Sequence, residues 1–238
     1  MTQLQVSGLT YRYGAKTALD DVEFAIGAGQ FCALLGPNGA GKSTLFSLLT
    51  RLLVAPAGTI HIAGHDIAQN PRAALAQLGI VFQQTTLDLD LTVRQNLTYF
   101  AALQGLTGKD RDRRIALVLD RLDMAQRADE KARALNGGHR RRTEIARALL
   151  HDPKILLLDE PTVGLDAQAR SAITDHVHAL SADGTTILWA THLADEVRDQ
   201  DRLIILHHGR VEADGTAGEI RGDQPLPAAF LARVGVAA

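Results

Sequence analysis

The sequence has little cysteine and no long apolar run. Cys32 is the only cysteine among 238 residues, which excludes an internal disulfide. The longest apolar runs, such as Ile155 to Leu158, fall far short of the roughly 20 residues that span a bilayer. Met1 to Gly8 lack the basic-then-apolar pattern of a secretory signal. We therefore expect a protein of a reducing cytoplasm, and we expect other chains to supply any membrane spans it works with.

A surplus of basic charge is also missing. The chain has 25 Lys and Arg against 27 Asp and Glu, a formal net charge of -2. Such a balance does not by itself favour nucleic acid or anionic lipid, so we expect no nucleic-acid partner. The 46% of hydrophobic residues can bury a sizeable core, and the length is that of one domain, which can have two lobes.

Patterns of apolar residues indicate the fold class. Leu4 to Ile26 alternate apolar and polar positions, which is typical of antiparallel strands with one solvated face. Short apolar runs predict buried strands, and a segment of three-to-four spacing from Leu91 to Leu150 predicts a helical insertion. These runs are Phe31 to Leu35, Thr59 to Ile62, Ile80 to Phe82, Ile155 to Leu158 and Thr186 to Ala190. Helices are expected from Ser43 to Leu53 and from about Ala167 to Ser181. The pattern predicts an α/β fold with a mainly parallel sheet.

A glycine-rich loop follows the first of these strands and precedes a helix. Its residues are Gly36, Pro37, Asn38, Gly39, Ala40, Gly41, Lys42 and Ser43. Glycines let successive backbone N–H groups turn toward an anion, and the helix adds its positive N-terminal end. Lys42 would reach the terminal phosphates of a nucleotide. Ser43 would offer its hydroxyl to Mg²⁺, and Thr44 offers a second hydroxyl to phosphate oxygens. A strand-helix turn with chance glycines is the alternative interpretation.

Two adjacent acids end the apolar strand at residues 155–158. In open α/β sheets ligands bind where the strands end. Asp159 would hold Mg²⁺ directly or through water, and Glu160 would orient the water that attacks the γ-phosphate. Without the phosphate loop, two acids that merely solvate a strand end would be the ordinary interpretation.

Together these motifs resemble the ABC-type ATPase family over nearly everything from Leu4 to Gly215. Further elements occur in the family's order: Tyr13, Gln83 after Phe82, the signature-like run Leu135-Asn136-Gly137-Gly138-His139 with its following helix, the segment Pro161 to Asp166, and His192. The resemblance implies a P-loop NTPase core, an antiparallel β subdomain and a helical subdomain at about residues 86–152. We expect an ATPase domain at 1–222 and a short, loosely attached tail at 223–238.

The resemblance also implies roles for these residues. Tyr13 would stack on adenine, and Gln83 would sense the γ-phosphate and contact Mg²⁺. His192 would hydrogen-bond the γ-phosphate, while Asp166 would be the acid of the D-loop. Asn136, Gly137, Gly138 and His139 would contact the nucleotide held by a second subunit. Taken singly, each would be an ordinary structural residue.

The signature run departs from the family at two positions. Asn136 stands where serine is usual, and His139 stands where glutamine is usual. An amide can donate a hydrogen bond to a phosphate oxygen as a hydroxyl does, but it is longer. His139 adds a pH dependence. This run also resembles a bacterial subgroup associated with quinone-dependent alcohol oxidation.

One phosphate loop and one signature imply a head-to-tail dimer, either of two copies or with a paralogous ATPase. Such a dimer would drive integral-membrane permease subunits from the inner face of the cell membrane. The segment at residues 86–100 resembles single-domain ATPases of exporters, and an appended regulatory domain of the importer kind is not expected, so export is favoured. The alternatives are a non-transport ABC ATPase, another P-loop enzyme such as a small kinase or GTPase, and a nucleotide-dependent regulator that never turns over.

Overall fold

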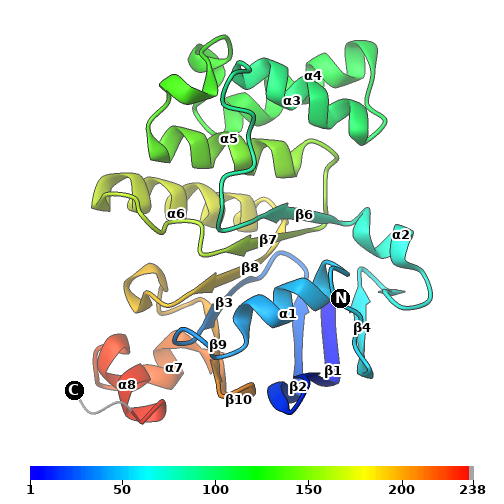
Figure 1. Cartoon of the computed structure of the whole chain (residues 1–238). Coiled ribbons are helices and arrows are strands. Elements are labelled where there is room, and N and C mark those ends of the chain that lie inside the picture. The colour runs from blue at the N-terminus through cyan, green and yellow to red at the C-terminus, as the bar shows by residue number, and fades with distance from the viewer. Residues whose placement is uncertain (236–238) are drawn as a thin grey trace.

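A six-stranded sheet forms the centre of the molecule (Figure 1). The computed structural model describes residues 1–235. The strand order is β10-β9-β3-β8-β7-β6, and every neighbouring pair except β10 and β9 is parallel. The strands are β3 (Phe31–Leu35), β6 (Leu78–Val81), β7 (Ile155–Asp159), β8 (Thr186–Thr191), β9 (Arg202–His207) and β10 (Arg210–Thr216). The expected mainly parallel sheet is confirmed.

A smaller antiparallel sheet lies beside it, with the order β2-β1-β4-β5. Its strands are β1 (Thr2–Tyr13), β2 (Lys16–Gly27), β4 (Ala57–Ile62) and β5 (His65–Asp66). Buried side chains alternate with exposed ones along β1 and β2, as a sheet with one solvated face requires. The hairpin of β1 and β2 ends near Tyr13, which brings that ring to the edge of the nucleotide-sized pocket described below.

Alternate residues of the central strands belong to two different cores. Along β7, Leu156 and Leu158 pack with the helical part of the molecule. Ile155 and Leu157 pack on the opposite face, with helix α1 (Lys42–Leu49) and the smaller sheet. The strands are therefore buried on both faces, which explains their nearly unbroken apolar sequence.

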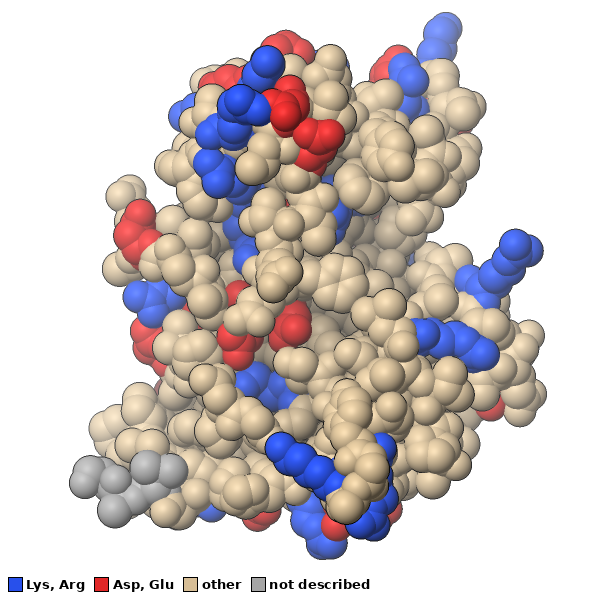
Figure 2. All heavy atoms as spheres, in the orientation of Figure 1, with Lys and Arg blue, Asp and Glu red and all other residues tan. Residues whose placement is uncertain are grey.

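The helical lobe consists of α3 (Val93–Leu103), α4 (Gly108–Arg121) and α5 (Gly137–Leu149). All three lie within the insertion expected at about residues 86–152 and form the top of the molecule in Figure 1. Figure 2 shows basic and acidic side chains next to one another over this lobe. Ion pairs such as Arg121 with Asp183, at 2.7 Å, hold several of its arginines.

Two expectations about helices are wrong. Helix α1 ends at Leu49 rather than Leu53, because the chain turns at Arg51, whose φ is +58°. The segment expected to be a loose tail contains helix α8 (Leu226–Arg233). Leu226 and Phe230 of this helix are buried in the same core as the central sheet. Residues 236–238 of that segment lie outside the described residues.

The remaining elements connect these layers. They are α2 (Pro71–Leu75), α6 (Ala167–Ala182), α7 (Ala217–Arg221) and the short 3-10 turns η1 (Ala125–Arg127), η2 (Ala132–Ala134) and η3 (Ala194–Glu196). Among residues 1–235, no helix is long and apolar enough to cross a membrane.

Candidate nucleotide site

The glycine-rich loop joins β3 to α1 and lines a pocket of about 580 Å³. Gly39 and Gly41 have φ of +82° and +115°, a region that favours glycine. A Cβ on Gly41 would also lie 2.7 Å from the carbonyl oxygen of Ala18. Only glycine therefore lets the loop turn this tightly against β2. The loop wraps the start of α1, whose free N–H groups favour an anion.

Most of the predicted nucleotide residues line this one pocket. They are Tyr13, Pro37, Asn38, Gly39, Gly41, Lys42, Ser43, Thr44, Gln83 and Glu160. The buried Gly36 and Ala40 shape the loop from behind. A Cβ on Gly36 would lie 2.5 Å from the carbonyl oxygen of Leu206, so its glycine is needed for close packing against β9. The ring of Tyr13 is half exposed and contacts Tyr11 edge-on, which leaves its face for a flat partner.

Glu160 is the centre of the polar contacts in this pocket. Its carboxylate accepts a hydrogen bond from Gln83 Nε2 at 3.1 Å and lies 3.2 Å from His192 Nδ1. The ammonium of Lys42 lies 3.5 Å from the same carboxylate. Three predicted residues, from the ends of β6 and β8 and from the phosphate loop, thus meet at the carboxylate of Glu160 at the end of β7.

The backbone at Glu160 is strained. Its φ is +47°, which costs a non-glycine residue about 1–2 kcal/mol. The conformation is held because Glu160 N donates to Ala190 O at 2.9 Å and Val163 N donates to Glu160 O at 3.3 Å. Such strain clusters at functional sites, where the surrounding structure sets it.

Two charged groups at the site have shifted pKa values. Burial lowers the pKa of Lys42, and the neighbouring Glu160 opposes that shift. Burial, with the adjacent charge of Glu160, raises the pKa of Asp159. A divalent cation beside Asp159 would offset the burial and the adjacent negative charge that raise its pKa. Asp159 at the strand end and the Ser43 hydroxyl supply oxygen atoms, the ligand type that Mg²⁺ prefers, so the residues present fit this cation.

The signature residues do not reach this pocket within one chain. Asn136 caps helix α5, and its Oδ1 accepts a hydrogen bond from His139 N at 2.8 Å. A Cβ on Gly137 would lie 2.8 Å from Leu165 Cδ2, and one on Gly138 would lie 3.0 Å from Ala169. The two glycines therefore allow the start of α5 to pack against the start of α6.

Asp166 belongs to this second cluster. Its side chain caps α6 by accepting from Ala169 N at 2.8 Å. The signature and the loop that ends at Asp166 thus form one surface, and none of these residues lines the pocket of the phosphate loop. The cap on α5 uses the oxygen of Asn136, which leaves its amide hydrogens for another acceptor. Burial and the nearby Arg127 and Arg142 lower the pKa of His139.

Sequence reasoning missed several residues around the pocket. Lys16, Thr17, Ala18, His208 and Gly209 also line it. The hairpin of β9 and β10 brings His208 beside the phosphate loop. Gly209 N donates to Ala40 O at 2.9 Å. A sequence pattern does not reveal this neighbour, because residues 40 and 209 meet only in the folded chain.

Comparison with known proteins agrees with the geometry. The family model described as ABC transporter matches residues 19–163. The chain is 39% identical over 224 residues to the daunorubicin resistance ATP-binding protein DrrA3 of Streptomyces coeruleorubidus, which covers 93% of this chain and 71% of the relative. It is 41% identical over 218 residues to the Nod factor export ATP-binding protein I of Ralstonia nicotianae, with coverage of 91% and 68%.

Solved structures give the same answer. An ATP-binding subunit of an ABC transporter has a TM-score of 0.84 at 30% identity, with 98% of this chain and 99% of that chain covered. A dimeric ATP-binding cassette in a post-hydrolysis state, bound to ADP and Pi, has a TM-score of 0.77 at 29% identity, with coverage of 90% and 98%. The chain therefore belongs to the ABC transporter family as an ATP-binding, ATP-hydrolysing subunit.

Proposed function

We propose that this chain binds MgATP in the pocket of the phosphate loop and hydrolyses it with Glu160 as the residue that orients the attacking water. The observation that carries the proposal is the meeting of Gln83, Lys42 and His192 at the Glu160 carboxylate. A carboxylate held by donors on several sides is fixed in direction, and a fixed general base is more effective than a mobile one.

The other residues take the remaining roles. Tyr13 stacks on the adenine, and the loop from Gly36 to Thr44 binds the phosphates with Lys42 as its cation. Ser43, Asp159 and Gln83 hold Mg²⁺, which supplies charge neutralisation at the phosphates. His192 donates to the γ-phosphate once it exchanges its contact with Glu160.

A second ATPase subunit completes the site. None of Asn136, Gly137, Gly138, His139 and Asp166 lines the pocket of its own chain. In a head-to-tail dimer, either of two copies or with a paralogue, the surface that they form covers the nucleotide of the partner. One structural relative is dimeric, which supports the formation of a dimer.

Export through separate permease subunits at the inner face of the cell membrane is the transport function we infer. Support comes from relatives that are an export ATP-binding protein and a drug-resistance ATP-binding protein. The domain of about 1–222, with its helical subdomain at 86–152, carries this activity. The narrower resemblance to the subgroup of quinone-dependent alcohol oxidation stays a prediction.

The test compares Glu160→Gln with Lys42→Ala. Glu160→Gln keeps the side-chain shape but removes the base, so ATP binding should persist while turnover falls about 100-fold or more. Lys42→Ala removes a charged phosphate contact and should nearly abolish MgATP binding. Calorimetric titration measures binding, and phosphate release measures turnover.

Glu23→Gln is the matched control, because Glu23 is an exposed glutamate of β2 outside the pocket. It should behave as the wild-type chain in both measurements. Turnover at the wild-type rate in Glu160→Gln would show that the base is another residue. Unchanged affinity in Lys42→Ala would show that the nucleotide binds elsewhere.

A further inference from the structure

Glu196 is a buried carboxylate that the proposed function does not use. It lies in η3, and its side chain is only 5% exposed. Oε2 accepts hydrogen bonds from Trp189 Nε1 at 3.0 Å and from Thr191 Oγ1 at 2.7 Å. Oε1 accepts from Thr162 Oγ1. A buried acid needs such donors, because a buried charge without hydrogen bonds would destabilise the folded chain.

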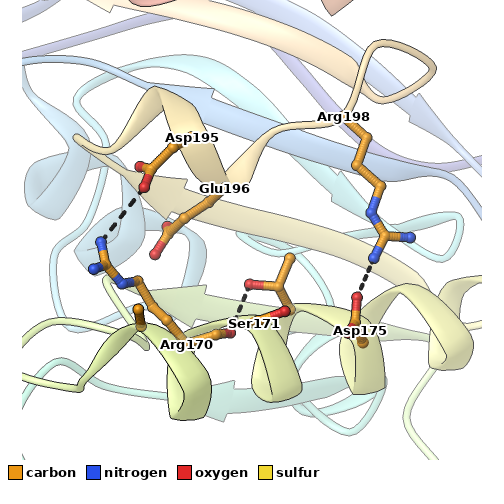
Figure 3. Close-up of a pocket in the computed structure, with 8 residues that line it drawn as sticks. Arg170, Ser171, Asp175, Asp195, Glu196 and Arg198 are labelled. Carbon is orange, nitrogen blue, oxygen red and sulfur yellow. Dashed lines mark hydrogen bonds and ion pairs between the residues drawn. The ribbon is translucent and has the colours of Figure 1, made fainter.

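The neighbouring arginines do not bind this carboxylate. Figure 3 shows Arg170 reaching Asp195 on one side of Glu196 and Arg198 reaching Asp175 on the other. Among the residues that the structure describes, Glu196 forms no ion pair within 4 Å. Its hydrogen bonds to two hydroxyls and an indole are therefore its main polar contacts. Hydrogen bonds to a charged acceptor are about twice as strong as neutral ones, and they are directional.

The three donors belong to the two segments that carry Glu160 and His192. Thr162 follows Glu160 by two residues, in the loop that ends at Asp166. Thr191 directly precedes His192, and its hydroxyl also accepts from Leu193 N at 3.0 Å. One carboxylate thus joins the loop after β7 to the end of β8, the two segments that carry Glu160 and His192.

We propose that Glu196 is a positioning residue for hydrolysis, which sets the direction of Glu160 and His192 and links both to the loop at residues 161–166. The inference rests on the proposed roles of Glu160 and His192. That loop and the signature residues form one surface. A second subunit that binds this surface would therefore also affect the position of Glu160 through the contact between Thr162 and Glu196. The ordinary alternative is that Glu196 only stabilises the core.

Thr162→Val separates these two explanations. Valine has nearly the shape of threonine but lacks the hydroxyl, so it removes the contact of the loop to Glu196 and leaves Trp189 and Thr191 bonded. We expect kcat for ATP hydrolysis to fall about tenfold, while KM for MgATP stays within about twofold, because the phosphate contacts are untouched. Thr162→Ser restores the hydroxyl and should restore kcat.

Glu196→Gln tests the carboxylate itself. The amide has one acceptor oxygen in place of two, so it removes the negative charge, and a threonine hydroxyl must turn from donor to acceptor to keep its contact. Trp189 is the only tryptophan of the chain, and its indole bonds Glu196, so its fluorescence should change in this variant along with the fall in kcat. Asp195→Asn is the matched control, because Asp195 lies in the same turn but pairs with Arg170 at the surface. It should leave both readouts unchanged.

Wild-type kcat in Thr162→Val would overturn the proposal, and so would equal losses in Thr162→Val and Thr162→Ser. If kcat falls only in proportion to a lower melting temperature, the proposal would also be overturned, because Glu196 would then only stabilise the core. Glu160→Gln in the same assay keeps the two proposals apart. If it is inactive while Thr162→Val is fully active, the positioning role fails and the proposed function stands. If it is active, the proposed function itself fails.

Discussion

At the scale of single residues, His151 shows how burial makes the protonated form of a side chain less favourable. His151, between α5 and β7, donates from Nε2 to Leu78 O at 2.9 Å. Its Nδ1 is buried and has no hydrogen-bond partner among the described residues. A second proton on this ring would therefore be desolvated and unpaired. Burial lowers the pKa of His151, and Arg114 acts in the same direction, while Asp152 and the bond to Leu78 oppose it.

This lowered pKa predicts a pH dependence of stability. The unfolded chain binds a proton at His151 near the ordinary pKa of 6.5, whereas the folded chain binds it only at lower pH. The contribution of His151 to the free energy of unfolding is therefore complete above about pH 6.5 and is lost as the pH falls through the folded pKa. The slope has a limit of about 1.4 kcal/mol per pH unit.

The variant that tests it is His151→Gln, since a glutamine amide can still donate to Leu78 O but does not titrate. Urea unfolding of both proteins between pH 5 and pH 7 gives the comparison. As the pH falls, the free energy of unfolding of the wild type should decrease relative to that of the variant. A difference that does not vary with pH would contradict the role of His151.

At the scale of elements, helix α5 is hydrogen-bonded to the loop that carries Gln83. Arg141 donates from Nη1 to Phe82 O at 2.7 Å and from Nη2 to Gln83 O at 2.9 Å. Glu144 pairs with Arg141 at 2.7 Å and accepts from Thr86 N at 2.8 Å. Helix α5, which follows the signature run, is thus connected to the segment of Gln83 through one buried ion pair. We therefore expect a displacement of the helical lobe to displace Gln83 as well.

Loss of one member of this pair should be costly. Burial raises the pKa of Glu144, although Arg141 opposes the shift. Glu144→Ala would leave a buried guanidinium without its carboxylate, and we expect a loss of about 3–5 kcal/mol in the free energy of unfolding. Chemical denaturation at pH 7 measures it.

The chain offers a control with the same spacing. Arg113 and Asp110 on α4 are also three residues apart, but their side chains are 77% and 76% exposed. Asp110→Ala should change the stability by no more than about 0.5 kcal/mol, because exposed pairs are screened. Equal effects of the two variants would show that burial does not decide the strength of the pair on α5.

At the scale of the whole molecule, the prediction concerns dimer formation at Asn136. Asn, Asp and Ser are all good caps, so Asn136→Asp and Asn136→Ser should both keep helix α5 folded. Asn136→Asp would place a carboxylate against phosphate in a partly desolvated interface, where like charges repel. ATP-dependent dimerisation should collapse in this variant, and ATP binding by the single chain should be spared.

Sedimentation of Glu160→Gln protein with ATP measures this effect, with and without each change at Asn136. Asn136→Ser should be tolerated, because a hydroxyl also donates to phosphate. A dimer that persists undiminished in the double variant with aspartate would show that Asn136 does not face the phosphate of a second subunit.

Local signals in the sequence were enough to predict much of the fold and of the nucleotide site. The phosphate loop, the strand before it and the acid pair at residues 159–160 are contiguous, so their geometry follows from backbone chemistry and short-range pattern. Buried strands such as β3 and β7 were predictable because burial on both faces leaves a continuous apolar run. The resemblance to the family came from the same short motifs.

Only the tertiary structure decided which distant residues complete the nucleotide site and the core. His208 lines the nucleotide pocket, Glu196 joins the segments of Glu160 and His192, and α8 packs against the core in place of a loose tail. Each depends on contacts between residues far apart in the chain, whose partners leave no periodic mark on the local sequence. The contribution of such residues depends on burial and on the donors they meet, and both exist only once the chain has folded.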